Sequence, residues 1–208
     1  MYAIITDGSI SKYVSHPKPL VIGDVQYPAR IFSAWTASEL AAIGIIEVTF
    51  DDSNKKDKKW YTNTNQTYTY DASAGTVTAT YGTATAKAHA DTLFTAQDET
   101  DGLGTEGEVK VEGLKTVLIR TVKAQAEDLL NQTDWYITRK AEKNIAIPSA
   151  ITTWRDGIRT KQAAMETSIT NASNTPALET LYTYVNTADE GDPKVMERPL
   201  GEFPELGS

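Results

Sequence analysis

The residue types that most often carry catalysis or bind metals are scarce in this sequence. The chain has no cysteine and two histidines, His16 and His89, which stand in unrelated contexts. A serine–histidine–acid triad or a histidine-ligated zinc requires a histidine in a defined polar setting, and neither neighbourhood provides one. Without cysteine, disulfides and thiolate metal sites are excluded. We therefore expect no catalytic residue, no metal site and no cofactor.

Acidic side chains are concentrated in two stretches, which are candidates for a calcium site and for a glycoside-hydrolysis site. Residues 51–57 carry enough oxygens for calcium, but they lack the glycine and the twelfth-position glutamate of an EF-hand loop, so a solvated turn is favoured. Residues 98–108 offer carboxylates for glycoside hydrolysis, which needs a rigid, partly apolar setting that separates two pKa values. Glycines adjoin these carboxylates, so a charged linker is favoured. The carboxylates are Asp98, Glu99, Asp101, Glu106 and Glu108.

Aromatic side chains provide two candidate binding surfaces. The first is the Tyr- and Thr-rich stretch from Trp60 to Tyr81, which is either a sugar-binding surface or, as we favour, a sheet with an aromatic inward face. The second mixes aromatic rings with arginine, a combination enriched at the energetic centres of protein interfaces. Its members are our candidate partner-binding residues: Trp135, Tyr136, Arg139, Trp154, Arg155 and Arg159.

The second surface depends on the connection between two predicted helices. This connection, Asp134 to Ile147, has 14 residues. Most helix–helix connections are shorter, so it should be anchored or functional. We expect Trp135 to be its buried anchor, with Trp154 as a neighbour. We also expect Arg139 and the arginines of the following helix to pair with carboxylates of the connection, which would orient it more than stabilise it.

Hydrophobic periodicity predicts an α+β chain, with a small β-rich N-terminal domain followed by a C-terminal helical hairpin or three-helix region. We assign residues 1–97 to the β-rich domain and 98–108 to an acidic, glycine-rich linker. Residues 109–188 form the predicted helical module. Residues 189–208 form an acidic, proline-containing tail, which we expect to stay mobile or to become ordered against a partner.

Within these domains, turn signals and apolar spacing place the individual elements. Predicted in the first domain are hairpins over 2–14 and 20–27, a capped helix over 36–44, a strand over 45–50, a hairpin over 60–81 and an Ala-rich helix over 83–96. In the helical module, helices are predicted over 109–132, after Pro148, and from Thr175. The second of these helices should bury one face, formed by Ile151, Trp154, Ile158, Met165 and Ile169.

Charge and hydropathy narrow the classes of partner. The formal net charge is −8 and the isoelectric point about 4.8, which argues against nucleic acid or an anionic membrane surface. No apolar run approaches the ~18–20 residues of a membrane span. The start of the chain also lacks the features of a secretory signal. We expect the protein to be made and used, or assembled into something larger, in a cytosol.

One stretch resembles a known family. The order Leu-Leu-x-x-Thr-Asp-Trp-Tyr-x-x-Arg-x-x-Glu, then Ile-Pro, then Trp-Arg-x-x-Ile-Arg, resembles the C-terminal domain of bacteriophage tail assembly chaperone proteins and related tail-fibre assembly modules. The resemblance covers roughly Lys123 to Arg159, under a fifth of the chain, and brings no catalytic residue.

The resemblance implies a non-enzymatic tail protein that docks onto, or helps assemble, tail, tail-fibre or baseplate components. It would act as a structural part of the virion tail or as a chaperone in the host cytoplasm. Its partners would be other phage tail proteins, and a homotrimer through the predicted first helix is an added expectation. The alternative is a host-surface glycan-binding adhesin or a polysaccharide-degrading tail protein.

Overall fold

The computed structural model describes residues 1–207 and divides the chain into two compact units, Met1–Thr85 and Ala86–Ser208. The first unit is rich in strands and the second in helices, so the predicted α+β class is confirmed. Among the described residues, no helix is both long enough and apolar enough to cross a membrane.

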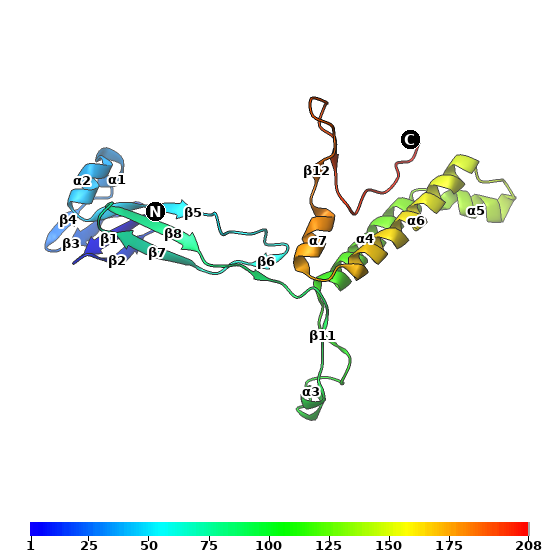
Figure 1. Cartoon of the computed structure of the whole chain (residues 1–208), viewed down its shortest axis with the longest axis horizontal. Helices are drawn as coiled ribbons and strands as arrows, with labels where there is room; N and C mark the ends of the chain where they lie inside the picture. Colours follow the sequence, from blue (N-terminus) through cyan, green and yellow to red (C-terminus); the bar gives the residue numbers. More distant parts are fainter. Residues whose placement is uncertain (208) are drawn as a thin grey trace. The chain divides into compact units, whose positions relative to one another are not determined.

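A five-stranded sheet forms the centre of the first unit. Its strand order is β2-β1-β5-β8-β7, in which β5 and β8 are parallel and the other neighbours antiparallel (Figure 1). The strands are β1 (Tyr2–Thr6), β2 (Ser9–Val14), β5 (Ile45–Asp51), β7 (Gln66–Asp71) and β8 (Thr76–Tyr81). The predicted hairpin over 2–14 and the strand from Ile45 are thereby confirmed.

The sheet buries apolar side chains on both faces, because successive residues of a strand point to opposite sides. On β1, Ala3 packs with Val48, Val77 and Ala79, whereas Ile4 belongs to the cluster on the other face. The two edge strands approach each other: the rings of Tyr13 on β2 and Tyr68 on β7 have centroids 4.7 Å apart. The sheet is therefore strongly curved.

Two short hairpin strands and two short helices cover one face of this sheet. They are β3 (Leu20–Ile22), β4 (Val25–Tyr27), α1 (Ile31–Ala34) and α2 (Ala37–Ala42). Thr36 and Glu39 form the predicted capping box of α2. Gly44 ends this helix with a φ of 79°, and a Cβ there would lie 2.6 Å from the carbonyl oxygen of Ile5, so only glycine fits.

The remaining strands are short. They are β6 (Tyr61–Thr62), β9 (Thr85–Ala86), β10 (Thr92–Leu93), β11 (Val109–Val111), β12 (Val185–Asn186) and β13 (Met196–Glu197). Because β9 and β10 lie within residues 83–96, the predicted Ala-rich helix there is wrong. Alanine favours a helix only weakly, and tertiary pairing overrides that preference.

The second unit is built around four helices: α4 (Leu114–Asn131), α5 (Asp134–Lys143), α6 (Ser149–Asn171) and α7 (Thr175–Tyr182). Helices α4 and α6 run side by side, with α5 at one end of the pair (Figure 1). The apolar face predicted for the second helix is confirmed, since all five of its residues are buried: Ile151, Trp154, Ile158, Met165 and Ile169. The helix predicted from Thr175 is also present.

The predicted acidic linker over 98–108 is not a linker. The division between the units falls after Thr85, and the acidic stretch belongs to the second unit. There, α3 (Ala96–Thr100) and a turn connect β10 to β11. Thr95 and Asp98 form a second capping box, which orders the acidic residues. Because β11 uses residues 109–111, the first long helix begins at Leu114 instead of at 109.

The predicted mobile tail is wrong for residues 198–204, which pack against the helices of the second unit. Leu200 is buried, and its backbone N–H donates to the carbonyl of Leu181 on α7. Phe203 packs against the cluster of Ala126, Trp154 and Ile158. Leu200 and Phe203 are thus packed against residues of α4, α6 and α7 that lie far from them in the sequence, and local sequence composition does not indicate this packing.

Candidate functional site

The connection between α4 and α6 is a helix, α5, and it contains no buried residue. Asp134 in its first turn and two lysines in its last turn suit the helix dipole, and Asn144 ends it with a φ of 54°. Trp135 is 51% exposed, so the prediction that it is the buried anchor of a loop is wrong.

Three of the candidate residues form one group on α5, which we call the aromatic–arginine group: Trp135, which is exposed, and Tyr136 and Arg139, which are half-buried. The two ring centroids lie 3.8 Å apart. The guanidinium carbon of Arg139 lies 4.8 Å from the Trp135 centroid and 5.0 Å from the Tyr136 centroid. Arg139 follows Trp135 by four residues and Tyr136 by three, and these spacings bring its guanidinium to both rings on a helix. The predicted pairing of Arg139 with a carboxylate is replaced by cation–π contacts.

Arg155, on α6, is a buried side chain that contacts the residues at the start of α5. Its side chain is 7% exposed, and Nη1 donates to the carbonyl oxygen of Leu130 at 2.8 Å and to Oγ1 of Thr133 at 2.7 Å. Its Nη2 pairs with Oδ1 of Asp134 at 2.8 Å. The predicted ion pair between Arg155 and the connection is confirmed. This buried fork joins the end of α4 to the first residue of α5 and so fixes the direction in which α5 leaves.

Trp154 is the buried tryptophan of this region. Its ring packs with Ala126 and Ile158, and its indole N–H donates to the carbonyl oxygen of Pro204 at 2.8 Å. It therefore anchors the C-terminal segment, whereas it was predicted to neighbour Trp135. Sequence reasoning missed this contact. The Phe203-Pro204 pair was its one visible signal, because an aromatic–proline pair within an acidic tail has apolar surface to bury.

Arg159 lies on the exposed side of α6 and pairs with Asp156, with Nη1 3.2 Å from Oδ1. This carboxylate belongs to α6 itself, so the predicted pairing of Arg159 with the connection is not found. The six candidate residues therefore take three positions. The aromatic–arginine group lies on α5 with Trp135 exposed and the other two side chains half-buried. Arg155 is buried beneath the start of α5, Trp154 is buried against the C-terminal segment, and Arg159 is a surface residue.

The acidic stretch forms structural contacts. Asp98 accepts from the backbone and side chain of Thr95 and pairs with Lys110 on β11. The hydrogen bond from Lys110 and those from Thr95 lower the pKa of Asp98 to about 2. A carboxylate held ionised in this way is a poor general acid near neutral pH. Over residues 1–207, no group of three or more His, Asp or Glu side chains is placed to hold a metal ion.

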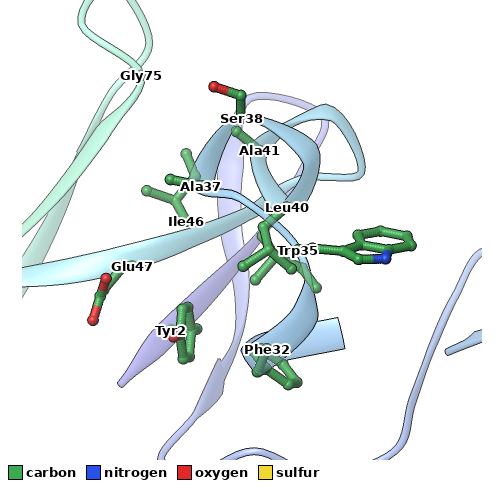
Figure 2. A pocket seen from close by; sticks show the side chains of 11 residues that line it. Tyr2, Phe32, Trp35, Ala37, Ser38, Leu40, Ala41, Ile46, Glu47 and Gly75 are labelled. Carbon is green, nitrogen blue, oxygen red and sulfur yellow. The ribbon is translucent and has the colours of Figure 1, made fainter. Parts of the chain in front are cut away.

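In the first unit, the aromatic residues divide into buried ones and a small recess. Trp60 and Tyr61 are buried, and Tyr68 and Tyr70 pack against the Ala3 cluster, as expected for an aromatic inward face. The recess, of about 500 Å³, lies between the sheet and the two short helices (Figure 2). Tyr2, Phe32, Trp35, Ser38 and Glu47 are among its lining residues.

The rings of Tyr2 and Phe32 have centroids 4.7 Å apart. Trp35 and Glu47 lie on opposite sides of Leu40 in Figure 2. No local sequence pattern indicates this recess, because its walls come from β1, β5 and the short helices, which only the fold brings together.

Comparison with known proteins adds no relative. No family model matches the chain, and neither the curated proteins nor the solved structures contain a significant match.

Proposed function

We propose that this chain is a non-enzymatic bacteriophage tail protein that docks onto, or helps assemble, tail, tail-fibre or baseplate components. It would serve either as a structural part of the virion or as an assembly chaperone. The proposal combines the resemblance over Lys123 to Arg159 with the geometry of α5. Partners are other tail proteins, reached through the aromatic–arginine group.

The aromatic–arginine group is the observation that carries the proposal. A tryptophan left half-exposed beside a tyrosine and an arginine leaves a large amphipathic surface in water, and such residues dominate the energy of protein interfaces. Ile137 on the same helix and Ile145 just after it add exposed apolar surface. The buried fork of Arg155 gives this surface a fixed orientation, so that docking does not have to order α5.

The experiment compares capture of tail, fibre and baseplate proteins by the wild-type chain and by Trp135→Ala. We expect capture of a tail component by the wild type and at least a tenfold weaker interaction for the variant, the ~1.4 kcal/mol or more that a hot-spot residue contributes. Phe50→Ala is the matched control, because Phe50 is a similarly exposed aromatic in the first unit. Equal capture by all three proteins would exclude α5 as the docking surface.

Particle composition separates the two versions of the function. A structural part is expected in purified particles at a fixed copy number, and a chaperone is expected to be absent from them. Quantitative mass spectrometry of particles purified by density gradient provides this measurement.

Glycan binding by the first unit is the second candidate function. Aromatic rings beside a hydroxyl and a carboxylate, as in the recess of Figure 2, are the side chains that stack on and hydrogen-bond to sugars. Glycan-array binding that Trp35→Ala abolishes would favour this candidate. Trp60 is buried, so Trp60→Ala would lower the stability of the first unit, and a loss of glycan binding in that variant would not identify a binding residue.

A further inference from the structure

The C-terminal residues 196–207, which we call the C-terminal arm, contact the rest of the second unit through strand pairing, cation–π contacts and a backbone hydrogen bond. Strand β13 at the start of the arm pairs with β12. The guanidinium carbon of Arg198 lies 5.5 Å from the ring centroids of both Tyr182 and Tyr184. Leu200 donates its backbone N–H to Leu181. Each of these contacts joins the arm to residues that precede it.

The end of the arm fits a groove on α6. The Trp154 indole donates to the carbonyl oxygen of Pro204, and Phe203 packs against the Trp154 cluster. Position 157 of α6 is a glycine, and a Cβ there would lie 3.3 Å from Cγ of Pro204. A glycine in the middle of a helix costs about 1 kcal/mol relative to alanine, so its presence directly beneath Pro204 indicates close approach of the arm.

The arm is connected to this body by an acidic loop, residues 187–195. The loop contains Asp189, Glu190 and Asp192, together with Gly191, whose φ is 97°. It closes through two kinds of local hydrogen bond, one from the backbone of Thr187 to Val195 and others to the side chain of Asn186. Few contacts therefore oppose the opening of this loop.

Exposed apolar side chains gather at both ends of the same loop. Tyr184, Val185, Val195 and Met196 are each 47–52% exposed. They lie on and beside β12 and β13, the two strands that the loop connects. The closed chain leaves this surface in water, where it favours association with another apolar surface.

We propose that two copies of this chain exchange their C-terminal arms, so that Phe203 and Pro204 of one copy occupy the α6 groove of the other. The occupant of the groove is thus a second copy of the same segment. Exchange preserves every arm–body contact named above, because each joins residues 196–207 to residues before the loop. This proposal concerns self-association and stands or falls independently of docking through α5.

The loop supplies the difference between the closed and exchanged forms. In an exchanged pair the two opened loops run past each other, which brings the exposed apolar side chains of the two copies together. The three loop carboxylates of one copy then also approach the three of the other copy. Added salt screens this repulsion, so the exchanged form increases with ionic strength. It also increases with protein concentration, because two chains must associate to form it.

Introduced cysteines test the exchange in the full-length protein, which has no cysteine of its own. Three single variants are made: Gly157→Cys, Pro204→Cys and, as a collision control, Phe50→Cys on the exposed surface of the first unit. A double variant, Gly157→Cys with Pro204→Cys, reports whether the groove geometry allows a disulfide within one chain. Reduced proteins are mixed at high concentration, incubated, oxidised and examined by non-reducing electrophoresis.

We expect the double variant to form a disulfide, and the mixed Gly157→Cys and Pro204→Cys chains to yield a product of twice the chain mass. This product should exceed that from Gly157→Cys mixed with Phe50→Cys, and it should increase with salt. A bridged double variant with no excess product from the mixed singles overturns the proposal, because the arm then binds only its own chain. Absence of bridging in every combination overturns the groove itself.

Discussion

Arg155 on α6 and Asp134 at the first position of α5 form an ion pair in which one partner is buried and the other is half-exposed, with Nη2 2.8 Å from Oδ1. The same guanidinium also donates to the carbonyl oxygen of Leu130 in the last turn of α4 and to the hydroxyl of Thr133, the residue just before α5. One side chain therefore joins three helices. The orientation of the aromatic–arginine group depends on this fork.

Replacing Arg155 tests its role as the support of α5. Arg155→Ala leaves the Leu130 carbonyl and the Thr133 hydroxyl without their donor, and we expect the free energy of unfolding to fall by about 2–3 kcal/mol. Arg155→Lys keeps the charge but cannot reproduce the fork, so it should recover only part of the loss. Chemical denaturation measures both. Arg159→Ala is the control, with an expected change of ~0–1 kcal/mol for an exposed pair; an equal loss there would contradict the assignment.

The two tryptophans near the helix pair should respond in opposite ways to truncation. Trp154→Ala is expected to lower the free energy of unfolding by about 3–5 kcal/mol, because a buried ring is lost. Trp135→Ala is expected to change it by less than about 1 kcal/mol. Thermal or urea unfolding of the two variants provides the comparison. Similar losses in both would show that Trp135 is part of the core.

Low pH should loosen the segment that contains α3. The pKa of Asp98 is lowered to about 2 in the folded chain from an ordinary value of 3.8, chiefly by its hydrogen bond from Lys110. A lowered pKa contributes stability that is present above about pH 4 and is lost as the pH falls towards 2. The protection factors of the amides in residues 92–111, which are exchange rates corrected for the intrinsic effect of pH, should therefore fall over this window. Asp98→Asn should remove the dependence, whereas Asp101→Asn, the same change three positions later, should retain it.

The capping box of α2 offers a test in the first unit. Thr36 accepts from the backbone of Glu39, and Glu39 accepts from the backbone of Thr36. Thr36→Ala should lower the free energy of unfolding by about 1 kcal/mol. Thr36→Ser, which keeps the hydroxyl, should be close to the wild type. A Thr36→Ser loss as large as that of Thr36→Ala would mean that the threonine methyl, and not the cap, is responsible.

Local signals predicted most of the short elements of the first unit. Asp7 and Gly8 mark the first hairpin turn, and Thr36, Glu39 and Gly44 bound the first capped helix. These features act within a few residues of one another, so the sequence is sufficient to recognise them. The parallel pairing of β5 with β8 was not predicted, because it joins strands separated by a long connection.

In the helical unit, the sequence alone determined that α6 has an apolar face, since the spacing of Ile151, Trp154 and Ile158 is a local property. It also determined that tryptophan, tyrosine and arginine would gather near α5. Only the tertiary structure decided which tryptophan is buried. Periodicity shows which side of a helix is apolar, whereas burial depends on whether another segment covers that side, and the C-terminal arm covers Trp154 while α5 leaves Trp135 in water.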